Sequence, residues 1–362
     1  MSGKKQVRRL SSSPSRRRTG RELFVGLDVH KKSVVATVLD REGNRVDQSS
    51  FGARDSELIT YLDGLPGRKH VVLEACNVWE HFYDAALSTD AEVTLAHPYR
   101  VRWISEASLK SDKVDSHSLA ELLRLRGIPM AYAPDAETRA LRQLVRDRAF
   151  YKREESGIKS HIYAALLRKG IQYDDGLLGQ KRKREELRTH QIPEVDRGLD
   201  ALHQFDELTK TLDEGIHEAF LKSKEAQLLE TIPGIGEFTA VALVAERCPI
   251  DRFPNIENLC SYAGLVPTNH PSGESSYQGH LKTDSNHLVK WLLVEASWSH
   301  RQWADKRSDV TKVARRVTRR GGKQKGNVAG AHKLRKIVYA VLKRGTPYTP
   351  DRPSSGVVAA ES

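Results

Sequence analysis

The sequence contains little cysteine and no long run of apolar residues. Its three cysteines, Cys76, Cys248 and Cys260, form no C-x-x-C pair, which argues against a disulfide-stabilised secreted domain and against a zinc ribbon. The sequence shows neither a signal peptide nor an apolar run that could span a bilayer, which argues against a membrane protein. The 362 residues are enough for two or three packed domains. With secreted and membrane proteins argued against, we expect a soluble intracellular protein.

Acidic residues are scarce in two segments of a chain whose net charge is +12. Residues 1–22 carry a net charge of +7 and residues 301–345 one of +13, whereas the remainder carries −8. Such basic segments favour polyanion binding, because neutralised phosphates release condensed counterions. For residues 1–22 a solvated, disordered tail without a partner is equally plausible, since the stretch SSSPSRRR is rich in Ser, Pro and Arg. For residues 301–345 we favour binding, because apolar residues are interleaved.

The first ordered part of the chain predicts a mixed sheet covered by helices. Apolar, β-branched runs at Leu23–Asp28 and Ser33–Leu39, with a third strand from Arg45, form a β-meander. Strands and helices then alternate, with strands at His70–Glu74 and Glu92–Ala96 and helices near 56–64, near 78–87 and after Asp112.

Two long helices are predicted next. Apolar residues recur at three- and four-residue steps from Asp135 to Arg168. From Val195 to Phe220 they keep close to a seven-residue repeat, as in a coiled-coil hairpin or a dimerising arm. A plain helical-bundle core is the alternative interpretation.

The turn Pro233–Gly236 separates two further helical patterns. Backbone N–H groups at Gly234 and Gly236 could hold a phosphate at a helix N-terminus, as in a helix-hairpin-helix clamp. The same glycines could serve only to let two helices pack closely. In a basic protein we favour the clamp.

Acidic residues at the ends of buried strands are the first candidates for chemistry. Asp28 ends the first apolar strand, Glu74 ends a later one, and Asp112 and Asp115 lie three apart at the start of a helix, which puts them on one face. Four carboxylates at one sheet edge require divalent cations, and oxygen ligands suit Mg²⁺ or Mn²⁺ in a nuclease or transesterase. Singly, each acid is explained as a turn residue, a helix N-terminal charge or an N-cap. Together, on a β-meander, they match a ribonuclease-H-like or RuvC-like arrangement.

Ser272 is the second candidate. It stands beside Gly273 in a segment of turn formers, which predicts a hydroxyl on a loop before a helix. From spacing alone an ordinary Ser–Gly turn is favoured, because no His or Asp partner is fixed and Ser275 or Ser276 would serve as well.

A set of motifs carries a family resemblance over residues 23–347. They are VGLDVHK, VVLEA, SDKVDS, TIPGIG, AGLVP followed by Ser272-Gly273, and GHLKTDSNHLVKWLL. In this order they closely resemble the transposases of insertion-sequence family 110. These are DEDD-plus-serine enzymes akin to the Piv-type DNA invertases, and are known as bridge-RNA-guided recombinases.

The resemblance implies a role for each candidate residue. Asp28, Glu74, Asp112 and Asp115 would be the catalytic, metal-binding tetrad of a RuvC-like domain, with Mg²⁺ or Mn²⁺ as cofactor. Ser272 would attack a DNA phosphodiester and form a 5′-phosphoserine link. The implied partners are donor and target DNA, a non-coding guide (bridge) RNA, and further copies of the chain in a dimer or tetramer, with the serine of one subunit meeting the tetrad of another. The implied location is the prokaryotic cytoplasm, at the nucleoid.

We therefore expect an α/β plus α protein that performs site-specific DNA recombination for transposition. The expected parts are a disordered basic tail (1–21), a RuvC-like DEDD domain with a mixed sheet (22–130), a helical coiled-coil section (131–228), a mainly helical C-terminal serine transposase domain with the helix-hairpin-helix (229–348) and a disordered tail (349–362). The residues expected to contact phosphates in the basic segment are Arg315, Arg316, Arg319, Arg320, Lys323 and Lys325. The alternatives are a metal-dependent, structure-selective nuclease such as a junction resolvase, in which Ser272 has no covalent role, and a non-enzymatic nucleic-acid-binding protein.

Overall fold

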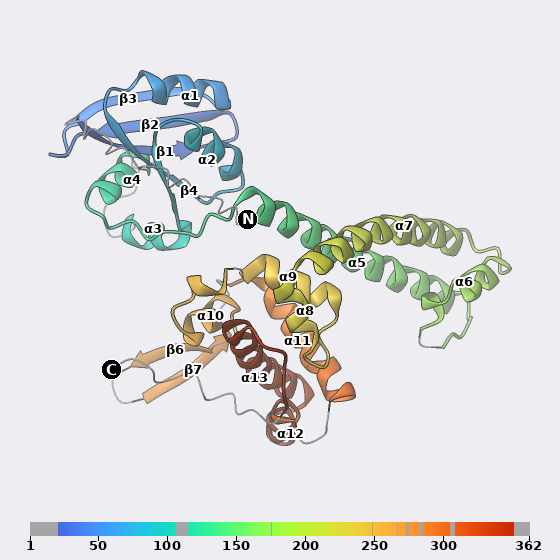
Figure 1. The fold of residues 1–362 in the computed structure, drawn as a ribbon. Coiled ribbons are helices and arrows are strands. Elements are labelled where there is room, and N and C mark those ends of the chain that lie inside the picture. Colours follow the sequence, from blue (N-terminus) through green and yellow to red (C-terminus); the bar gives the residue numbers. More distant parts are fainter. Residues whose placement is uncertain are drawn as a thin grey trace, which may run out of the picture. The chain divides into compact units, whose positions relative to one another are not determined.

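The chain forms two compact units, one ending at Pro134 and the other beginning at Asp135 (Figure 1). The computed structural model describes residues 21–105, 115–174, 176–247, 249–265, 267–272, 275–281, 285–304 and 308–350. The first unit is mixed α/β and the second is mostly helical, which confirms the expected α/β plus α class. The expected tail at 1–21 lies almost wholly outside the described residues, and so does most of the tail at 349–362. The division near residue 228 stays a prediction.

A five-stranded mixed sheet, of order β3-β2-β1-β4-β5, organises the first unit. The strands are β1 (Glu22–Val29), β2 (Ser33–Leu39), β3 (Arg45–Gly52), β4 (Arg68–Glu74) and β5 (Glu92–Ala96). The first three form the predicted antiparallel meander, whereas β4 pairs with β1 and β5 with β4 in parallel. A parallel neighbour requires a crossover, which α1 (Asp55–Gly64) and α2 (Trp79–Leu87) supply.

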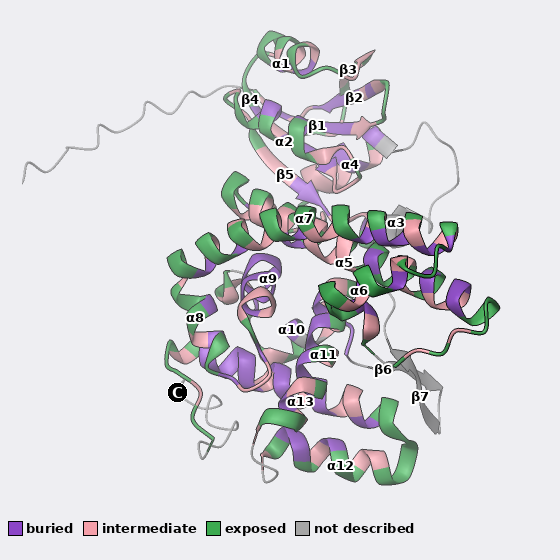
Figure 2. Ribbon diagram, turned by 90° about the vertical axis from the view of Figure 1, so that its right-hand side faces the viewer, coloured by how far each residue is buried: buried purple, intermediate pink, exposed green. Residues whose placement is uncertain are grey.

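Different helices cover the two faces of this sheet. Alternate β1 residues, among them Val25 and Leu27, are buried in one cluster with Leu58 of α1 and Phe82 of α2. Figure 2 shows buried stretches along β1 in the ribbon coloured by burial. On the opposite face α4 (Asp115–Arg124) packs over β1, and its Leu119 belongs to a second cluster. That cluster also includes a residue of α3 (Pro98–Ser105), a helix that the sequence did not predict because its apolar residues show no clear period.

Gly26 lies where α4 touches the sheet. A Cβ atom there would overlap the carbonyl oxygen of Ser116 and lie 2.6 Å from the backbone nitrogen of Ala120. We expect Gly26→Ala to destabilise the first unit by about 3 kcal/mol, because backbone atoms would have to move. Gly64→Ala is the matched control, since no atom lies within 4 Å of its added methyl group, and it should stabilise α1 by about 0.5–1 kcal/mol. Denaturant unfolding measures both; equal stability of the two variants would contradict the close packing.

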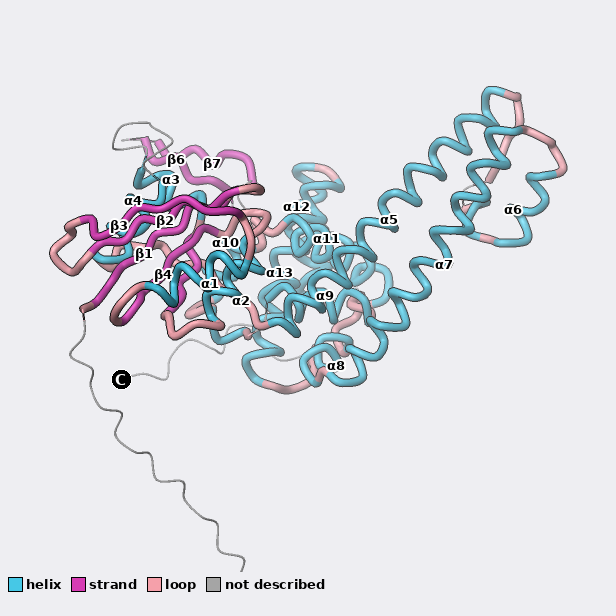
Figure 3. Tube along the Cα trace, turned by 90° about the horizontal axis from the view of Figure 1, so that it is seen from above, coloured by secondary structure: helices cyan, strands magenta, loops and turns pink. Residues whose placement is uncertain are grey.

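Two long helices begin the second unit, as predicted. They are α5 (Ala136–Arg168), whose N-cap Asp135 accepts a hydrogen bond from the Thr138 backbone nitrogen at 2.7 Å, and α7 (Pro193–Lys222). Figures 1 and 3 show them side by side. The predicted stripe on α7 is not continuous, because Leu208 is exposed and Thr209 is buried in its place. The sequence did not predict the short α6 (Lys181–Arg188) between them.

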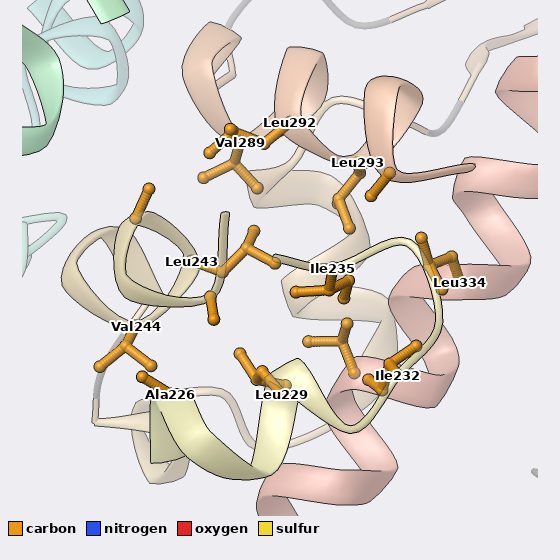
Figure 4. Close-up of a cluster of buried hydrophobic side chains, with 14 of the residues drawn as sticks. Ala226, Leu229, Ile232, Ile235, Leu243, Val244, Val289, Leu292, Leu293 and Leu334 are labelled. Atoms are coloured by element: carbon orange, nitrogen blue, oxygen red, sulfur yellow. The ribbon is translucent and has the colours of Figure 1, made fainter. Parts of the chain in front are cut away.

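The remaining helices pack around one large core. They are α8 (Lys224–Glu230), α9 (Glu237–Arg247), α10 (Ile256–Tyr262), α11 (His287–Trp303), α12 (Asp309–Gly321) and α13 (Lys323–Arg344). Figure 4 shows side chains such as Leu229, Leu243 and Leu334 converging from several of these helices. Val145 of α5 and Ile216 of α7 belong to the same cluster, so one end of the long helices is part of this core. In the described part of the chain no helix is both long and apolar enough to cross a membrane.

A two-stranded antiparallel hairpin, β6 (Pro267–Ser272) and β7 (Ser275–Leu281), precedes α11. The sequence predicted a loop here, and that prediction is wrong, because the segment forms two paired strands. Pro267 and Pro271 argue against a central strand because proline cannot donate to the ladder. In a two-stranded ribbon both strands are edge strands, where proline is tolerated.

Candidate active site and nucleic-acid interface

Asp28 and Glu74 lie one residue beyond the last matched pair of the adjacent parallel strands β1 and β4, while Asp28 still pairs with β2 and Glu74 with β5. Leu27 of β1 is in register with Leu73 of β4, and each acid comes one residue later. Because side chains alternate along a strand, both acids lie on the face opposite the two leucines, which is the face that α4 covers. The structure therefore places these two of the four predicted acids next to each other.

The Asp28 side chain is mostly buried and has one hydrogen-bond partner that sequence reasoning missed. Its Oδ2 lies 2.9 Å from Nε2 of His30, with 18% of the aspartate side chain exposed against 60% of the histidine. A ring N–H donated to a carboxylate fixes the orientation of that carboxylate. The only signal in the sequence was the Asp-x-His spacing at the strand end.

Asp115 is the first residue of α4. The next residue, Ser116, lies over Gly26, and its hydroxyl is 2.8 Å from Oγ1 of Thr37 on β2. Gly26 stands two residues before Asp28 on the same face, so α4 begins above the part of the sheet that carries Asp28 and Glu74. Asp112 and the side chain of Asp115 lie outside the described residues. Among the side chains that are described, no group of three or more His, Cys, Asp or Glu could hold a metal ion.

Ser272 belongs to the second unit, where it is the last residue of β6 and is in register with Ser275. Ser276 follows on β7, opposite Pro271. The described backbone thus gathers three serines at one end of the hairpin. Their side chains and residues 273–274 lie outside the description, and the choice of Ser272 stays a prediction.

The glycine turn has a packing role that the structure makes plain. Gly234 has φ +89° and approaches α11 so closely that a Cβ atom would lie 2.7 Å from the Ala296 carbonyl oxygen. Nδ1 of His300 on α11 donates to the Pro233 carbonyl at 2.6 Å, and burial lowers the pKa of His300 because it disfavours the charged ring. Gly236, in contrast, is exposed with open space around it. Phosphate binding at either glycine stays a prediction.

The basic segment forms a helical hairpin with an exposed cationic side. α12 and α13 meet at Gly322, where φ is +89°, and Gly326 lets the two helices approach closely. All six predicted phosphate contacts are exposed, and none forms an ion pair with another described residue: Arg315, Arg316, Arg319, Arg320, Lys323 and Lys325. Nearby, burial lowers the pKa of His332 to about 4, and Arg335 and Lys336 add to the shift. This histidine therefore adds no charge at neutral pH.

Replacing the six exposed cations by Gln should weaken DNA and RNA binding with little sequence preference. Each lost phosphate contact removes about 0.9 from the slope of log K against log salt, so the slope should flatten by up to about five. Filter binding at several salt concentrations measures it. The midpoint of thermal unfolding should stay the same, because the six side chains lie outside the core. Unchanged affinity and slope would show that this side is merely solvated.

Comparison with known proteins bears on both units. A family model for the IS110-type DEDD transposase matches residues 25–170, and the model "Transposase IS116/IS110/IS902 family" matches residues 226–312. The transposase for insertion sequence element IS1111A of Coxiella burnetii is 22% identical over 94% of this chain and 95% of its own length. The transposase for IS1328 of Yersinia enterocolitica is 25% identical over 90% of this chain and 98% of its own. The pilin gene-inverting protein of Moraxella bovis is 24% identical, covering 77% of this chain and 81% of its own.

These matches define the class first: the chain is a transposase, an enzyme that modifies DNA. The two family models match successive parts of the chain, residues 25–170 and then 226–312, and together span most of it. The chain therefore belongs to the IS110 family of transposases.

Proposed function

We propose that this transposase is a site-specific recombinase that combines a metal-binding RuvC-like acid cluster with a nucleophilic serine. The observation that carries the proposal is the adjacency of Asp28 and Glu74 at the ends of parallel strands, beneath the helix that begins at Asp115. The likeness to a pilin gene-inverting protein supports cutting and rejoining rather than cutting alone.

The donor chemistry at this edge suits a hard divalent cation. Asp28 and Glu74 offer carboxylate oxygens, and the proposed site is completed by Asp112 and Asp115. Mg²⁺ or Mn²⁺ held there would stabilise charge on the attacking and leaving oxygens of a phosphodiester. His30 would hold Asp28 in a fixed orientation through the 2.9 Å hydrogen bond.

Ser272 supplies the covalent step. Its hydroxyl gives up a proton as Oγ bonds to phosphorus, and the bond from phosphorus to the 3′ oxygen breaks, so that the departing 3′ oxygen takes up a proton and becomes a DNA 3′ hydroxyl. A new 3′ hydroxyl then attacks the phosphoserine and releases the serine. The number of phosphodiester bonds is conserved, so the exchange needs no external energy source.

The helical hairpin of α12 and α13 and the glycine turn at Pro233–Gly236 are the proposed nucleic-acid contacts. The six exposed cations would hold DNA or RNA backbones, and the exposed N-terminus of α9 at Gly236 would act as the phosphate clamp of a helix-hairpin-helix. Base pairing with a guide RNA would choose the DNA sites. Sequencing of the RNA that co-purifies with the expressed element tests this part, and recovery of no single structured RNA would count against it.

Metal removal tests the core of the proposal. In EDTA the purified protein, supplied with its guide RNA, should no longer cleave DNA carrying the element ends, and added Mg²⁺ or Mn²⁺ should restore cleavage. A mobility-shift assay in EDTA is the control, because the cationic side chains should still bind DNA. Cleavage at the normal rate in EDTA would mean that the acids do not form a metal site.

A further inference from the structure

Glu246 is a charged residue inside the core of the second unit. It lies on α9 after the buried residues Leu243 and Ala245, and its own side chain has no exposed surface. Arg146 of α5 holds both carboxylate oxygens, with Nε 2.7 Å from Oε1 and Nη2 3.0 Å from Oε2. The Arg146 side chain is 51% exposed, so only the carboxylate is fully buried. Because burying a charge carries a desolvation cost, stability alone does not explain its place in the core.

Asn286 also donates a hydrogen bond to the Glu246 carboxylate. Its side-chain amide donates to Oε2 at 2.8 Å and to the hydroxyl of Tyr262 at 3.1 Å. Its backbone nitrogen donates to the Tyr262 carbonyl at 2.9 Å, while its Oδ1 caps α11 by accepting from Val289. The Tyr262 hydroxyl donates in turn to the Glu246 carbonyl oxygen at 2.9 Å. Glu246 thereby holds the end of α10 through its carbonyl oxygen and the start of α11 through its carboxylate, and Asn286 links the two helix ends directly.

The two residues that are tied together bracket the hairpin. Tyr262 precedes β6, Asn286 follows β7, and Ser272 ends β6 between them. A two-stranded hairpin is marginally stable by itself, so its direction depends on how its two chain ends are held. Six residues of strand span about 20 Å, so a tilt of about 5° at the base would move Ser272 by about 2 Å. A displacement of about 1 Å can cost about 100-fold in rate.

We propose that Glu246 is a positioning residue for Ser272. Its charge, neutralised by Arg146, holds Asn286 and Tyr262 in one arrangement and so sets the direction of the hairpin. Arg142 strengthens the connection to α5, since its Nε donates to the Ala245 carbonyl at 2.7 Å. The inference rests on the proposed role of Ser272 and adds that the long helix and the serine hairpin share one buried anchor.

Glu246→Gln tests the inference in the full chain, loaded with guide RNA and element-end DNA. Gln keeps the volume but removes the charge. The single-turnover rate of covalent adduct formation at saturating DNA should fall about 10- to 100-fold, while the Kd for DNA stays within about twofold. Amide hydrogen exchange in β6 and β7 should become faster, which reports on the hairpin without any chemistry.

Glu155→Gln is the matched control. Glu155 is also a buried glutamate, paired with Lys152 at 2.6 Å and Lys159 at 2.5 Å on α5, and among the described residues it forms no hydrogen bond or ion pair with Tyr262, Asn286 or the hairpin. This variant should keep the wild-type adduct rate and hairpin exchange. Tyr262→Phe, which removes one hydroxyl, serves as the second variant should Glu246→Gln not fold, and should show the same two effects to a smaller degree.

The outcomes separate this inference from the proposed function. A wild-type protein that forms no adduct would overturn the role of Ser272, while the exchange measurement would still decide whether Glu246 holds the hairpin. Unchanged exchange in Glu246→Gln, or equal losses of rate in the two glutamate variants, would overturn the positioning role.

Discussion

Ser272→Ala should leave no protein attached to DNA. When the wild-type reaction is stalled, for example on a nicked substrate, we expect protein linked to a DNA 5′ end, because the serine oxygen remains bonded to phosphorus. Removing the nucleophile should reduce this product by at least about 10³-fold. Denaturing gels with 5′- and 3′-labelled DNA detect the adduct and show which end carries it.

Ser275→Ala and Ser276→Ala are the matched controls for this experiment. Both serines lie on β7 beside the end of β6, so their backbones share the neighbourhood of Ser272. Each variant should form the adduct at the wild-type rate. Normal cleavage by Ser272→Ala without an adduct would favour a junction resolvase. Loss of the adduct in Ser275→Ala or Ser276→Ala instead would identify that serine as the nucleophile.

Asp28→Asn should abolish strand cleavage while DNA binding survives. The amide oxygen can still accept the hydrogen bond from His30, so the local geometry is kept and the negative charge is lost. We expect a loss of at least about 10²-fold in single-turnover cleavage, the scale of removing one preorganised electrostatic group. The Kd for DNA should stay within about twofold, because the phosphate contacts lie elsewhere.

Asp47→Asn is the matched control, because it also removes one carboxylate charge from the sheet. Asp47 lies on β3 of the same sheet, where its carboxylate accepts hydrogen bonds from Tyr61 and Ser49, which lower its pKa. This variant should cost some stability and leave cleavage intact in the folded protein. Equal losses of cleavage in both variants would mean that Asp28 acts only through the stability of the sheet.

The sequence predicted the strands of the first unit well because each carries a clear signal. Apolar, β-branched runs mark β1 and β2, and the third strand follows closely, which leaves few other pairings. We expected Asp28 and Glu74 at one edge of the sheet because each ends a buried strand. In the structure Leu27 of β1 is in register with Leu73 of β4, so the two acids come at the same level. The register itself could not be predicted, since it pairs residues that lie far apart in the sequence.

Other features depend on contacts between distant parts of the chain, which local patterns do not carry. Two prolines concealed the β6–β7 hairpin. The close approach of Gly234 to α11 is visible only once the helices are packed, as is the pairing of Glu246 with Arg146. In the sequence Glu246 is simply one charge near the end of an apolar helix.

The acids and Ser272 stand on different compact units of the chain, which join at Pro134 and Asp135. In the proposed mechanism neither unit alone carries a complete set of reacting groups, so a truncated or nicked product of the gene would be inert toward the chromosome. An element that lives in its host's DNA is harmed by every stray break that its own enzyme makes. In the proposed mechanism, dividing the reacting groups between two units would make breakage depend on an intact chain.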